Sequence, residues 1–438
     1  MTFGIDLGTT NSLIGYGDTL YSGLVSSNVD IAERKQVSRD IAGPNVVASY
    51  KKDMSTTGTG LLPQECSSII LKELADQAGR RSGCVVEDVV ISVPAYFSVP
   101  QREAVKISAS KAGLRVKSLI NEPTAAALYM CKSLKDLVLV YDLGGGTFDI
   151  SLIDSRVGNY SVVATDGIIL GGDDLDEALA KEVISVCKVP VRYRGKLGMQ
   201  RLKFKMRLAK EQIQSSRSNI VIDFNDIGLN VVYTLTPERY VEIVREVFGK
   251  TIDMTQHIID VSVPEYEKPK IAFVGGSSQC PYLKEMLRDE LGLEEVSCKT
   301  APDLIVAMGA AMYAQMVDIG TAFDLVEDVT KRLCIADAMG RTITFIENNS
   351  IIPVRIEKIL RNAVMSSKLE ISMYQGDSIM ASECEYIGEL VYDYGRVVEA
   401  GQGDVNVTIE VQYDGTIVLQ AVEPFSDKPP KEIKLSIK

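Results

Sequence analysis

The sequence lacks several patterns that define large classes of proteins. It has one histidine, His257, which excludes a metal site built from several histidines. No apolar run approaches the ~18 residues of a membrane-spanning helix. No basic region with a cleavage site marks a signal peptide at the N-terminus. The net charge of −12 argues against general nucleic-acid binding. Catalysis in this chain would therefore have to use carboxylates, lysine and a bound metal.

The eight cysteines indicate neither a metal site nor a disulfide framework, because they are scattered and form no Cys-x-x-Cys pair. We expect most of them to be buried thiols in a reducing, cytoplasmic compartment. The length of 438 residues is sufficient for two or three domains.

A glycine-rich turn stands between two apolar runs in the stretch from Val138 to Leu152. The first run ends at Asp142, and residues 144–146 are glycines followed by Thr147. This pattern predicts strand, tight turn and strand. Consecutive glycines allow the backbone N–H groups to form a concave nest that binds phosphate oxygens. Asp142 would stand at the mouth of that nest, where a hard cation or its water shell is held.

The same device occurs near the start of the chain. Residues 3–14 run from an apolar segment through Asp6 and Gly8 into a small polar turn and a second apolar segment. An ordinary hairpin explains one such turn equally well. Two of them predict two similar half-domains that face each other across a nucleotide. Neither has the spacing of a Walker loop or a dinucleotide fingerprint, since no helix opens directly after the glycines.

Strands and helices alternate up to about residue 322, which predicts an α/β domain. The expected helices cover residues 63–78, 98–113, 124–132, 171–186, 199–216, 281–291 and 303–315. After residue 322 apolar and polar residues alternate, and Asp414-Gly415 marks a hairpin turn. We therefore expect a separate antiparallel β domain of roughly 110 residues.

Several motifs resemble the signatures of the seventy-kilodalton heat-shock chaperone family. They are residues 5–12 (IDLGTTNS), 93–97 (VPAYF), 120–127 (INEPTAAA) and 141–149 (YDLGGGTFD), with close variants at 170–174 and 274–277. The resemblance covers nearly the whole chain. It implies an α/β actin-like two-lobed ATPase domain over residues 1–322, a linker over 323–330 and an all-β sandwich that binds extended peptide over 331–438. In the family a helical lid normally follows the sandwich, and this sequence ends at Lys438 without one.

The resemblance also assigns roles to individual residues, together with ATP or ADP and magnesium as ligands. The catalytic group is Lys51, Glu122, Asp142 and Thr147, and Asp6 and Asp142 hold magnesium through water. The nucleotide-binding residues are Gly8, Thr9, Thr10, Asn11, Gly144, Gly145, Gly146, Gly171, Gly172, Lys210, Gly275, Gly276, Ser277 and Asp303. Lys52 is the alternative to Lys51, because the flanking sequence matches loosely. Met339 matches a loop residue that arches over the peptide, although a methionine without that role fits the sequence as well.

The partners implied are unfolded or extended peptide segments, a J-domain co-chaperone and a nucleotide-exchange factor, with no nucleic acid and no membrane. Three departures from the family bear on these expectations. Arg207 stands where a ribose-binding glutamate is usual, and Gln279 stands where an arginine stacks on adenine. In the linker, Asp324 and Glu327 replace apolar residues. Nucleotide affinity and coupling between the domains are therefore the properties expected to differ.

Two other functions fit parts of the sequence. A nucleotide-binding scaffold or sensor with weak hydrolysis is favoured by the altered adenine positions and linker. A sugar or acetate kinase on the same fold is compatible with the two hairpins, but the β domain after residue 330 argues against it. We expect an ATP-dependent chaperone.

Overall fold

The computed structural model describes residues 1–30, 36–38, 46–47, 51, 54, 63–95, 97–130, 136–156, 160–296, 298–321, 325–326, 328–329, 331–348, 350–412, 416–424 and 429–435. The chain divides into two compact units. The first unit comprises Met1–Pro94 and Ser108–Ala322, and the second comprises Ala95–Ile107 and Phe323–Lys438. Among the described residues, no helix is both long and apolar enough to cross a membrane.

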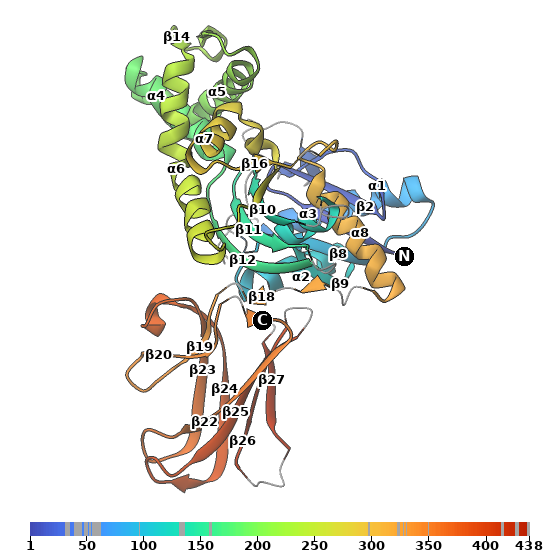
Figure 1. Cartoon of the computed structure of the whole chain (residues 1–438), viewed down its shortest axis with the longest axis vertical. Coiled ribbons are helices and arrows are strands. Elements are labelled where there is room, and N and C mark those ends of the chain that lie inside the picture. Colours follow the sequence, from blue (N-terminus) through green and yellow to red (C-terminus); the bar gives the residue numbers. More distant parts are fainter. Residues whose placement is uncertain are drawn as a thin grey trace. The chain divides into compact units, whose positions relative to one another are not determined.

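Two sheets of the first unit repeat one topology (Figure 1). The first has the order β3-β2-β1-β8-β9, with β4 paired to β2, and the strands of the second that belong to the first unit have the order β12-β11-β10-β15-β16. The central strand of each, β1 or β10, pairs antiparallel with the next strand of its hairpin and parallel with a later strand, β8 or β15. The strands of the first sheet are β1 (Thr2–Leu7), β2 (Asn11–Tyr16), β3 (Thr19–Leu20), β4 (Val25–Ser26), β8 (Asp88–Val93) and β9 (Arg115–Asn121). The strands of the second are β10 (Leu137–Leu143), β11 (Phe148–Asp154), β12 (Tyr160–Ile168), β15 (Lys270–Val274) and β16 (Glu294–Glu295). The predicted pair of similar halves is thus present in the sheet topology.

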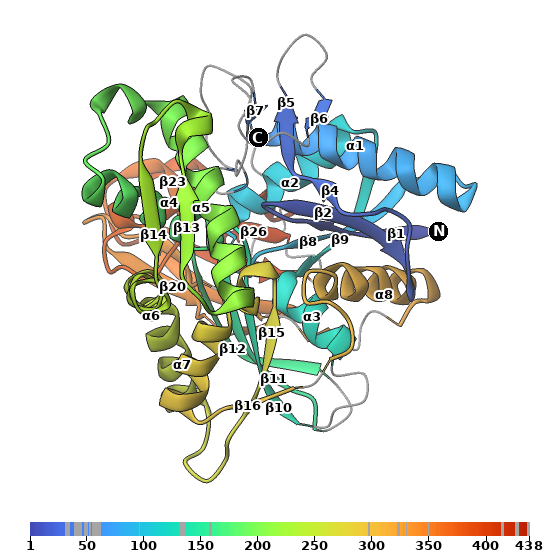
Figure 2. The same cartoon turned by 90° about the horizontal axis from the view of Figure 1, so that it is seen from above.

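Helices cover both faces of the first sheet. Figure 2 shows α1 (Pro63–Ser82) on one face and α8 (Ile305–Ile319) on the other. Helix α3 (Glu122–Met130) crosses α8 at such close range that a Cβ on Gly309 would lie 1.7 Å from the carbonyl oxygen of Ala125. Helix α2 spans Val99–Lys111. Beside this sheet lies a small one of order β6-β5-β7, formed by β5 (Asn28–Asp30), β6 (Gln36–Ser38) and β7 (Val46–Val47).

The second sheet shares its core with a group of helices. Buried side chains of β10 and β11 pack with those of α4 (Gly172–Val186), α5 (Lys196–Ser216), α6 (Pro237–Ser262) and α7 (Pro281–Leu291). A hairpin of β13 (Ile220–Asp223) and β14 (Val232–Leu235) and the short helices η3 (Val191–Tyr193), η4 (Asn225–Ile227) and η5 (Gly276–Gln279) complete this part. A hydrogen bond of 2.6 Å between the hydroxyls of Tyr141 and Thr251 ties β10 to α6 inside the core.

The helix predictions for the first unit are confirmed, with shifted ends. Helix α5 begins three residues before the expected start at Met199, after the N-cap residue Gly195. Helix α6 was not expected, although its signals were present. Thr236 caps it by accepting a hydrogen bond from the Arg239 N–H at 3.3 Å, and a proline occupies the first turn.

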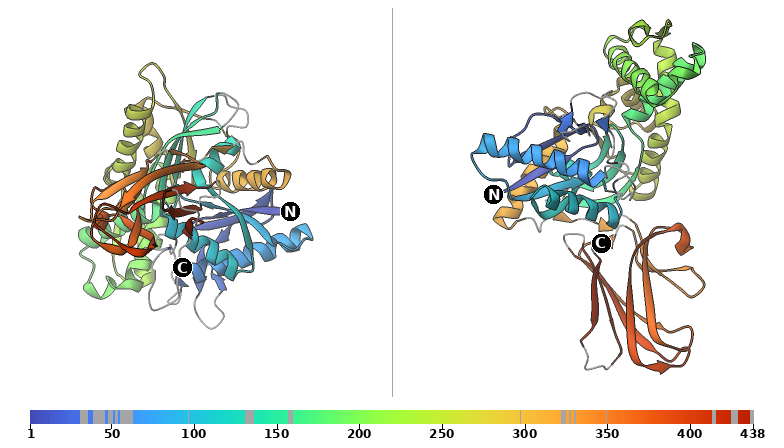
Figure 3. Two further views of the ribbon diagram at one scale, coloured as in Figure 1. Left: turned by 90° about the horizontal axis from the view of Figure 1, so that it is seen from below. Right: turned by 180° about the vertical axis from the view of Figure 1, so that it is seen from behind.

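The second unit contains two four-stranded antiparallel sheets around one hydrophobic cluster (Figure 3). One has the order β20-β19-β23-β24, and the other β22-β25-β26-β27. The strands are β19 (Leu333–Ala336), β20 (Thr342–Ile346), β22 (Val354–Arg361), β23 (Ser366–Gln375), β24 (Glu385–Val398), β25 (Asp404–Val411), β26 (Ile417–Val422) and β27 (Lys431–Leu435). Short elements are β17 (Leu325–Val326), β18 (Asp328–Val329), β21 (Ser350–Ile351) and η7 (Ala381–Glu383).

The hairpin predicted around Asp414-Gly415 is confirmed by the register of β25 and β26, in which Val411 lies opposite Ile417. The two turn residues themselves lie outside the described part of the chain, as do Lys52, Asp324 and Glu327.

Candidate nucleotide-binding site

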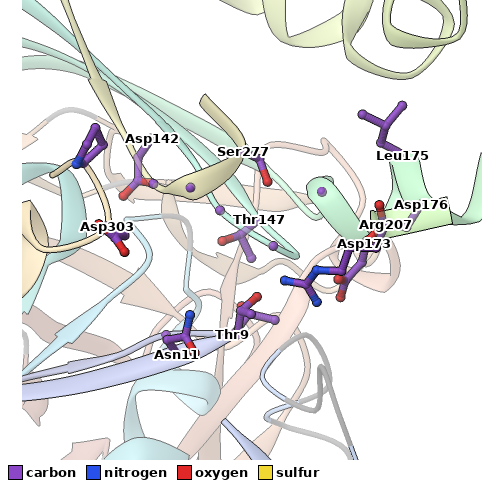
Figure 4. A pocket seen from close by; sticks show the side chains of 18 of the residues that line it. Thr9, Asn11, Asp142, Thr147, Asp173, Leu175, Asp176, Arg207, Ser277 and Asp303 are labelled. Atoms are coloured by element: carbon purple, nitrogen blue, oxygen red, sulfur yellow. The ribbon is translucent and has the colours of Figure 1, made fainter. Parts of the chain in front are cut away.

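The two predicted hairpin turns meet at one cavity of about 260 Å³ (Figure 4). A Cβ on Gly8 would lie 2.1 Å from the Asn11 carbonyl oxygen, and a Cβ on Gly145 would lie 2.1 Å from the Thr10 hydroxyl. A side chain at position 8 would therefore clash with backbone, and one at position 145 would displace the Thr10 hydroxyl. The second contact also shows that the turn after β1 touches the turn after β10. The sequence predicted two turns that face each other, and in the structure they do.

Two further glycine turns join the first two. At the start of α4, the Gly172 and Asp173 N–H groups donate to the carbonyls of Gly144 and Gly145, at 3.0 and 2.7 Å. A Cβ on Gly172 would lie 2.3 Å from the Ser277 hydroxyl, so the turn after β15 also reaches this point. Four backbone turns thus converge on one cavity, and glycine is required at their contacts.

Gly275 is held at φ +78°, a conformation that L side chains rarely adopt. Its N–H donates to the Pro302 carbonyl at 3.2 Å. A Cβ there would lie 2.6 Å from the Leu143 carbonyl and 2.7 Å from Oδ1 of Asp142. The turn after β15 is therefore fixed directly beside the carboxylate of β10.

A cluster of acidic side chains and one lysine lies at the mouth of the turns. Lys51 and Glu122, both buried, form an ion pair with 2.5 Å between Nζ and Oε1. Asp6 accepts a hydrogen bond from the Ser92 hydroxyl at 3.0 Å. Asp142 is buried on β10. The cluster thus brings together residues from two strands, one helix start and one loop position that are far apart in the sequence.

The electrostatics of this cluster favour a bound cation. Burial, and next the negative charge of Glu122, raise the pKa of Asp6 to about 7, while Lys51 and the Ser92 hydrogen bond act in the opposite direction. Burial also raises the pKa of Asp142 well above its usual range, with Glu122, Asp149 and Asp6 adding to the effect. Burial and repulsion between like charges both raise the pKa of a carboxyl group. A bound cation offsets both effects.

The residues present fit a hydrated magnesium ion. Magnesium keeps several of its waters and binds through one or two carboxylates and substrate phosphates. Asp6 and Asp142 would supply those carboxylates beside the glycine turns. Among the described residues, no group of three or more histidine, cysteine, aspartate or glutamate side chains is placed to enclose a metal ion directly.

One face of α5 forms the far wall of the cavity. Arg207, Lys210, Glu211 and Gln214 line it at helical spacing. Lys210 pairs with the buried carboxylate of Asp176 at 2.6 Å. Burial raises the pKa of Asp176, and Lys210 counteracts this shift.

The polar ends of this wall are also fixed. Arg207 lies 3.7 Å from Glu211, and the Gln214 amide donates to the Tyr240 hydroxyl at 2.5 Å. This wall therefore presents both charges and an amide to a ligand.

Most residues predicted for nucleotide binding line the cavity. They are Asp6, Gly8, Thr9, Thr10, Asn11, Lys51, Glu122, Asp142, Gly144, Gly145, Thr147, Gly172, Lys210, Gly275, Gly276, Ser277 and Asp303. Gly146 and Gly171 are buried in the turns behind this surface. Gln279 is exposed and is not among the lining residues. Met339 lies in the second unit, in a turn between β19 and β20, and is 74% exposed.

Several lining residues were missed by the sequence analysis. They are Asp173, Leu175, Asp176, Glu211, Gln214, Phe248, Pro302 and Val306. Helical spacing was a usable signal for Glu211 and Gln214, because they lie four positions after Arg207 and Lys210, and residues four apart share a helical face. Phe248 could not have been found, because it lies on α6, which the pattern analysis did not identify.

Comparisons with known proteins agree with this geometry. The family model described as Hsp70 protein matches residues 32–437. The chaperone protein DnaK of Mycoplasma mobile is 32% identical over an alignment that covers 97% of this chain and 76% of the relative. The chain therefore belongs to the Hsp70 family of ATP-dependent molecular chaperones.

Proposed function

We propose that the first unit is an actin-like ATPase domain that binds ATP with magnesium in the cavity between the two hairpin turns and hydrolyses it. The observation that carries this proposal is the contact of the turns after β1 and β10, with Asp6, Asp142 and the Lys51–Glu122 pair at their mouth. Backbone N–H groups in such turns bind phosphate oxygens. The cavity also continues to α5, which leaves room for a nucleoside beyond the phosphates.

The chemistry requires positioning and charge neutralisation more than covalent catalysis. A water attacks the γ-phosphorus, the bond to the bridging oxygen breaks, and ADP, phosphate and a proton are released. Lys51 would stabilise the charge on the γ-phosphate oxygens, and Thr147 would orient the phosphate. Glu122, held by Lys51, would orient the attacking water and accept its proton. Magnesium, when bound, neutralises phosphate charge.

The second unit supports a peptide-binding role. Its two sheets enclose an apolar core and leave the turn with Met339 exposed. An extended peptide is held in such sites through main-chain hydrogen bonds and an apolar pocket. A linker at 323–330, binding of a J-domain co-chaperone and of an exchange factor, and a cytoplasmic location remain predictions from the resemblance.

The test is a single-turnover measurement of ATP hydrolysis by the full chain, with and without magnesium. We expect magnesium-dependent hydrolysis, and we expect Asp142→Asn to lose the magnesium-dependent part of nucleotide affinity. Asp289→Asn is the control, because Asp289 is a 67% exposed carboxylate of α7. Nucleotide binding without turnover would favour the scaffold function, and a chain that neither binds nor cleaves ATP would contradict the proposal.

A further inference from the structure

The α5 wall of the nucleotide cavity changes character along its length. Arg207 and Glu211 bring charges to its first part, and Lys210 donates to the Gly172 carbonyl at 3.4 Å, close to the glycine turns. Gln214 lies one helical turn beyond Lys210, ~6 Å further along the axis, and also lines the cavity. The wall therefore ends in a neutral amide beyond its charged residues.

The same cavity has apolar lining residues from helices that share a core with α5. Leu175 of α4 and Phe248 of α6 line it, and both belong to the hydrophobic cluster that contains the buried side chains of α5. A nucleobase has two flat faces that pack on apolar side chains and a polar edge that needs hydrogen bonds. The cavity therefore offers apolar surface and an amide for a base, in addition to glycine turns for phosphates.

A buried tyrosine fixes the orientation of the Gln214 amide. The amide nitrogen donates to the hydroxyl of Tyr240 at 2.5 Å, and the Tyr240 side chain is buried in α6. The same hydroxyl lies 3.8 Å from the sulfur of Cys280, a buried residue at the start of α7. The Tyr240 ring also packs against the Tyr282 ring, with 5.5 Å between the ring centroids. Tyr240 is thus held from α7, and it holds Gln214 in turn.

The rest of the Gln214 amide is available to a ligand. A glutamine side chain has two N–H donors and one carbonyl acceptor, and Tyr240 takes one of the donors. Among the residues that the structure describes, none hydrogen-bonds to the Gln214 carbonyl oxygen. The amide therefore offers one acceptor and one donor side by side. Glutamine uses this pair of groups to bind the exocyclic amine and a neighbouring ring nitrogen of adenine.

We propose that Gln214 selects the base of the nucleotide, with Tyr240 as the residue that positions it. The Gln214 carbonyl oxygen accepts a hydrogen bond from the exocyclic amine of adenine, and its second N–H donates to the ring nitrogen beside that amine. A 6-oxopurine has a carbonyl oxygen in place of the amine, so two acceptors would face each other. A site built to hydrogen-bond a group rejects an analogue that lacks it, because its own polar atom is left unpaired. This inference rests on the proposed function, since it assumes that a nucleotide occupies the cavity.

The experiment measures binding of ATP and of inosine triphosphate to the full chain with magnesium, by competition with a fluorescent ATP analogue. The two nucleotides share the ribose and the triphosphate, so the ratio of their dissociation constants isolates the effect of the base. We expect the wild type to prefer ATP about fivefold or more, as one net hydrogen bond implies. Gln214→Leu should bring the ratio close to one, mainly by weakening ATP binding. The control is Gln212→Leu, at an exposed glutamine of α5 that does not line the cavity, and it should keep the wild-type ratio.

A second variant, Tyr240→Phe, keeps the buried ring and removes the hydroxyl that holds the amide. It should lower the preference for ATP, whereas a merely structural role of Tyr240 would change the affinities for both nucleotides equally. An unchanged ratio in Tyr240→Phe overturns its positioning role. The inference on Gln214 is overturned, and the proposed function stands, if ATP binds but Gln214→Leu keeps the wild-type ratio or the wild type shows no preference. A chain that binds neither nucleotide overturns both.

Discussion

The Lys51–Glu122 pair allows a catalytic loss to be separated from a loss of stability. Both side chains are nearly inaccessible, at 3% and 9% exposure, and 2.5 Å apart. Replacing Lys51 by alanine leaves the Glu122 charge buried without this partner, which costs ~3–5 kcal/mol of folding free energy. Loss of a group that stabilises charge in the transition state should lower turnover by ~10²-fold or more. Nucleotide binding should be largely intact, because the turns remain.

A double-mutant cycle completes the test. Glu122→Gln should destabilise the chain less, because Lys51 still has Asp6 and Asp142 as opposite charges and loss of the Glu122 charge relieves repulsion on both. The combination Lys51→Met with Glu122→Gln removes both charges, and replacing a whole buried pair is often neutral for stability. We therefore expect the free energy of unfolding to recover in the double variant while turnover stays low. Urea denaturation and single-turnover hydrolysis measure the two quantities independently.

The structure also supplies a matched control. Lys270 and Asp136 form an ion pair of the same kind at 2.6 Å, but both side chains are more than one-third exposed. Breaking an exposed pair should cost no more than about 1 kcal/mol. Turnover that recovers together with stability in the double variant would show that neither Lys51 nor Glu122 has a catalytic role. Unchanged turnover in Lys51→Ala would transfer that role to Lys52.

Four further predictions concern other parts of the chain. The pKa of Asp6 in the folded state is about 7, above its ordinary value, so the folded wild type loses stability as pH rises from about 4 to 7. Metal-free Asp6→Asn lacks this loss and should become more stable relative to wild type over the same range. Urea titrations at several pH values measure the difference. Gly309→Ala should unfold the first unit at a lower temperature, because its Cβ would meet the α3 backbone at 1.7 Å, whereas Gly249→Ala in α6 meets open space and should stabilise by ~1 kcal/mol. Met339→Ala should weaken binding of a leucine-rich heptapeptide to the full chain, measured by fluorescence anisotropy. The linker at 323–330 should make peptide stimulation of ATP turnover small, because its acidic residues stand at two positions that are apolar in the family. Loss of two leucine-sized burials removes roughly 3–6 kcal/mol at most from docking of the linker. A several-fold stimulation would contradict this.

The turns of the site could be predicted because their signals are local. An apolar run, an aspartate and glycines occur within a few adjacent residues, and the backbone that they require follows from the absence of side chains. The contact of Gly145 with Thr10 was expected only as a consequence of two similar halves, and the sheet topology supplies that similarity. Local chemistry thus predicted the glycine turns without any information on the distances between them.

The opposite wall could not be derived in the same way. Glu211 and Gln214 are ordinary polar residues of an amphipathic helix, and only the packing of α5 on α4 decides which of its faces meets the cavity. The position of this wall depends on tertiary contacts between residues far apart in the chain, for which a single sequence carries no signal.

The candidate nucleotide-binding site carries an electrostatic cost that bound ligands would remove. Asp6 and Asp142 are held beside Glu122 where burial disfavours the charges of the two aspartates, and among the described residues Lys51 only partly offsets this. A hydrophobic replacement would be more stable, so stability does not explain the arrangement. The charged carboxylates would interact favourably with a bound cation that also neutralises the phosphates. Ligands that bind the folded state and not the unfolded state raise the free energy of unfolding by mass action. The first unit should therefore gain more stability from magnesium and nucleotide together than from nucleotide alone. In Asp6→Asn this extra gain should be reduced.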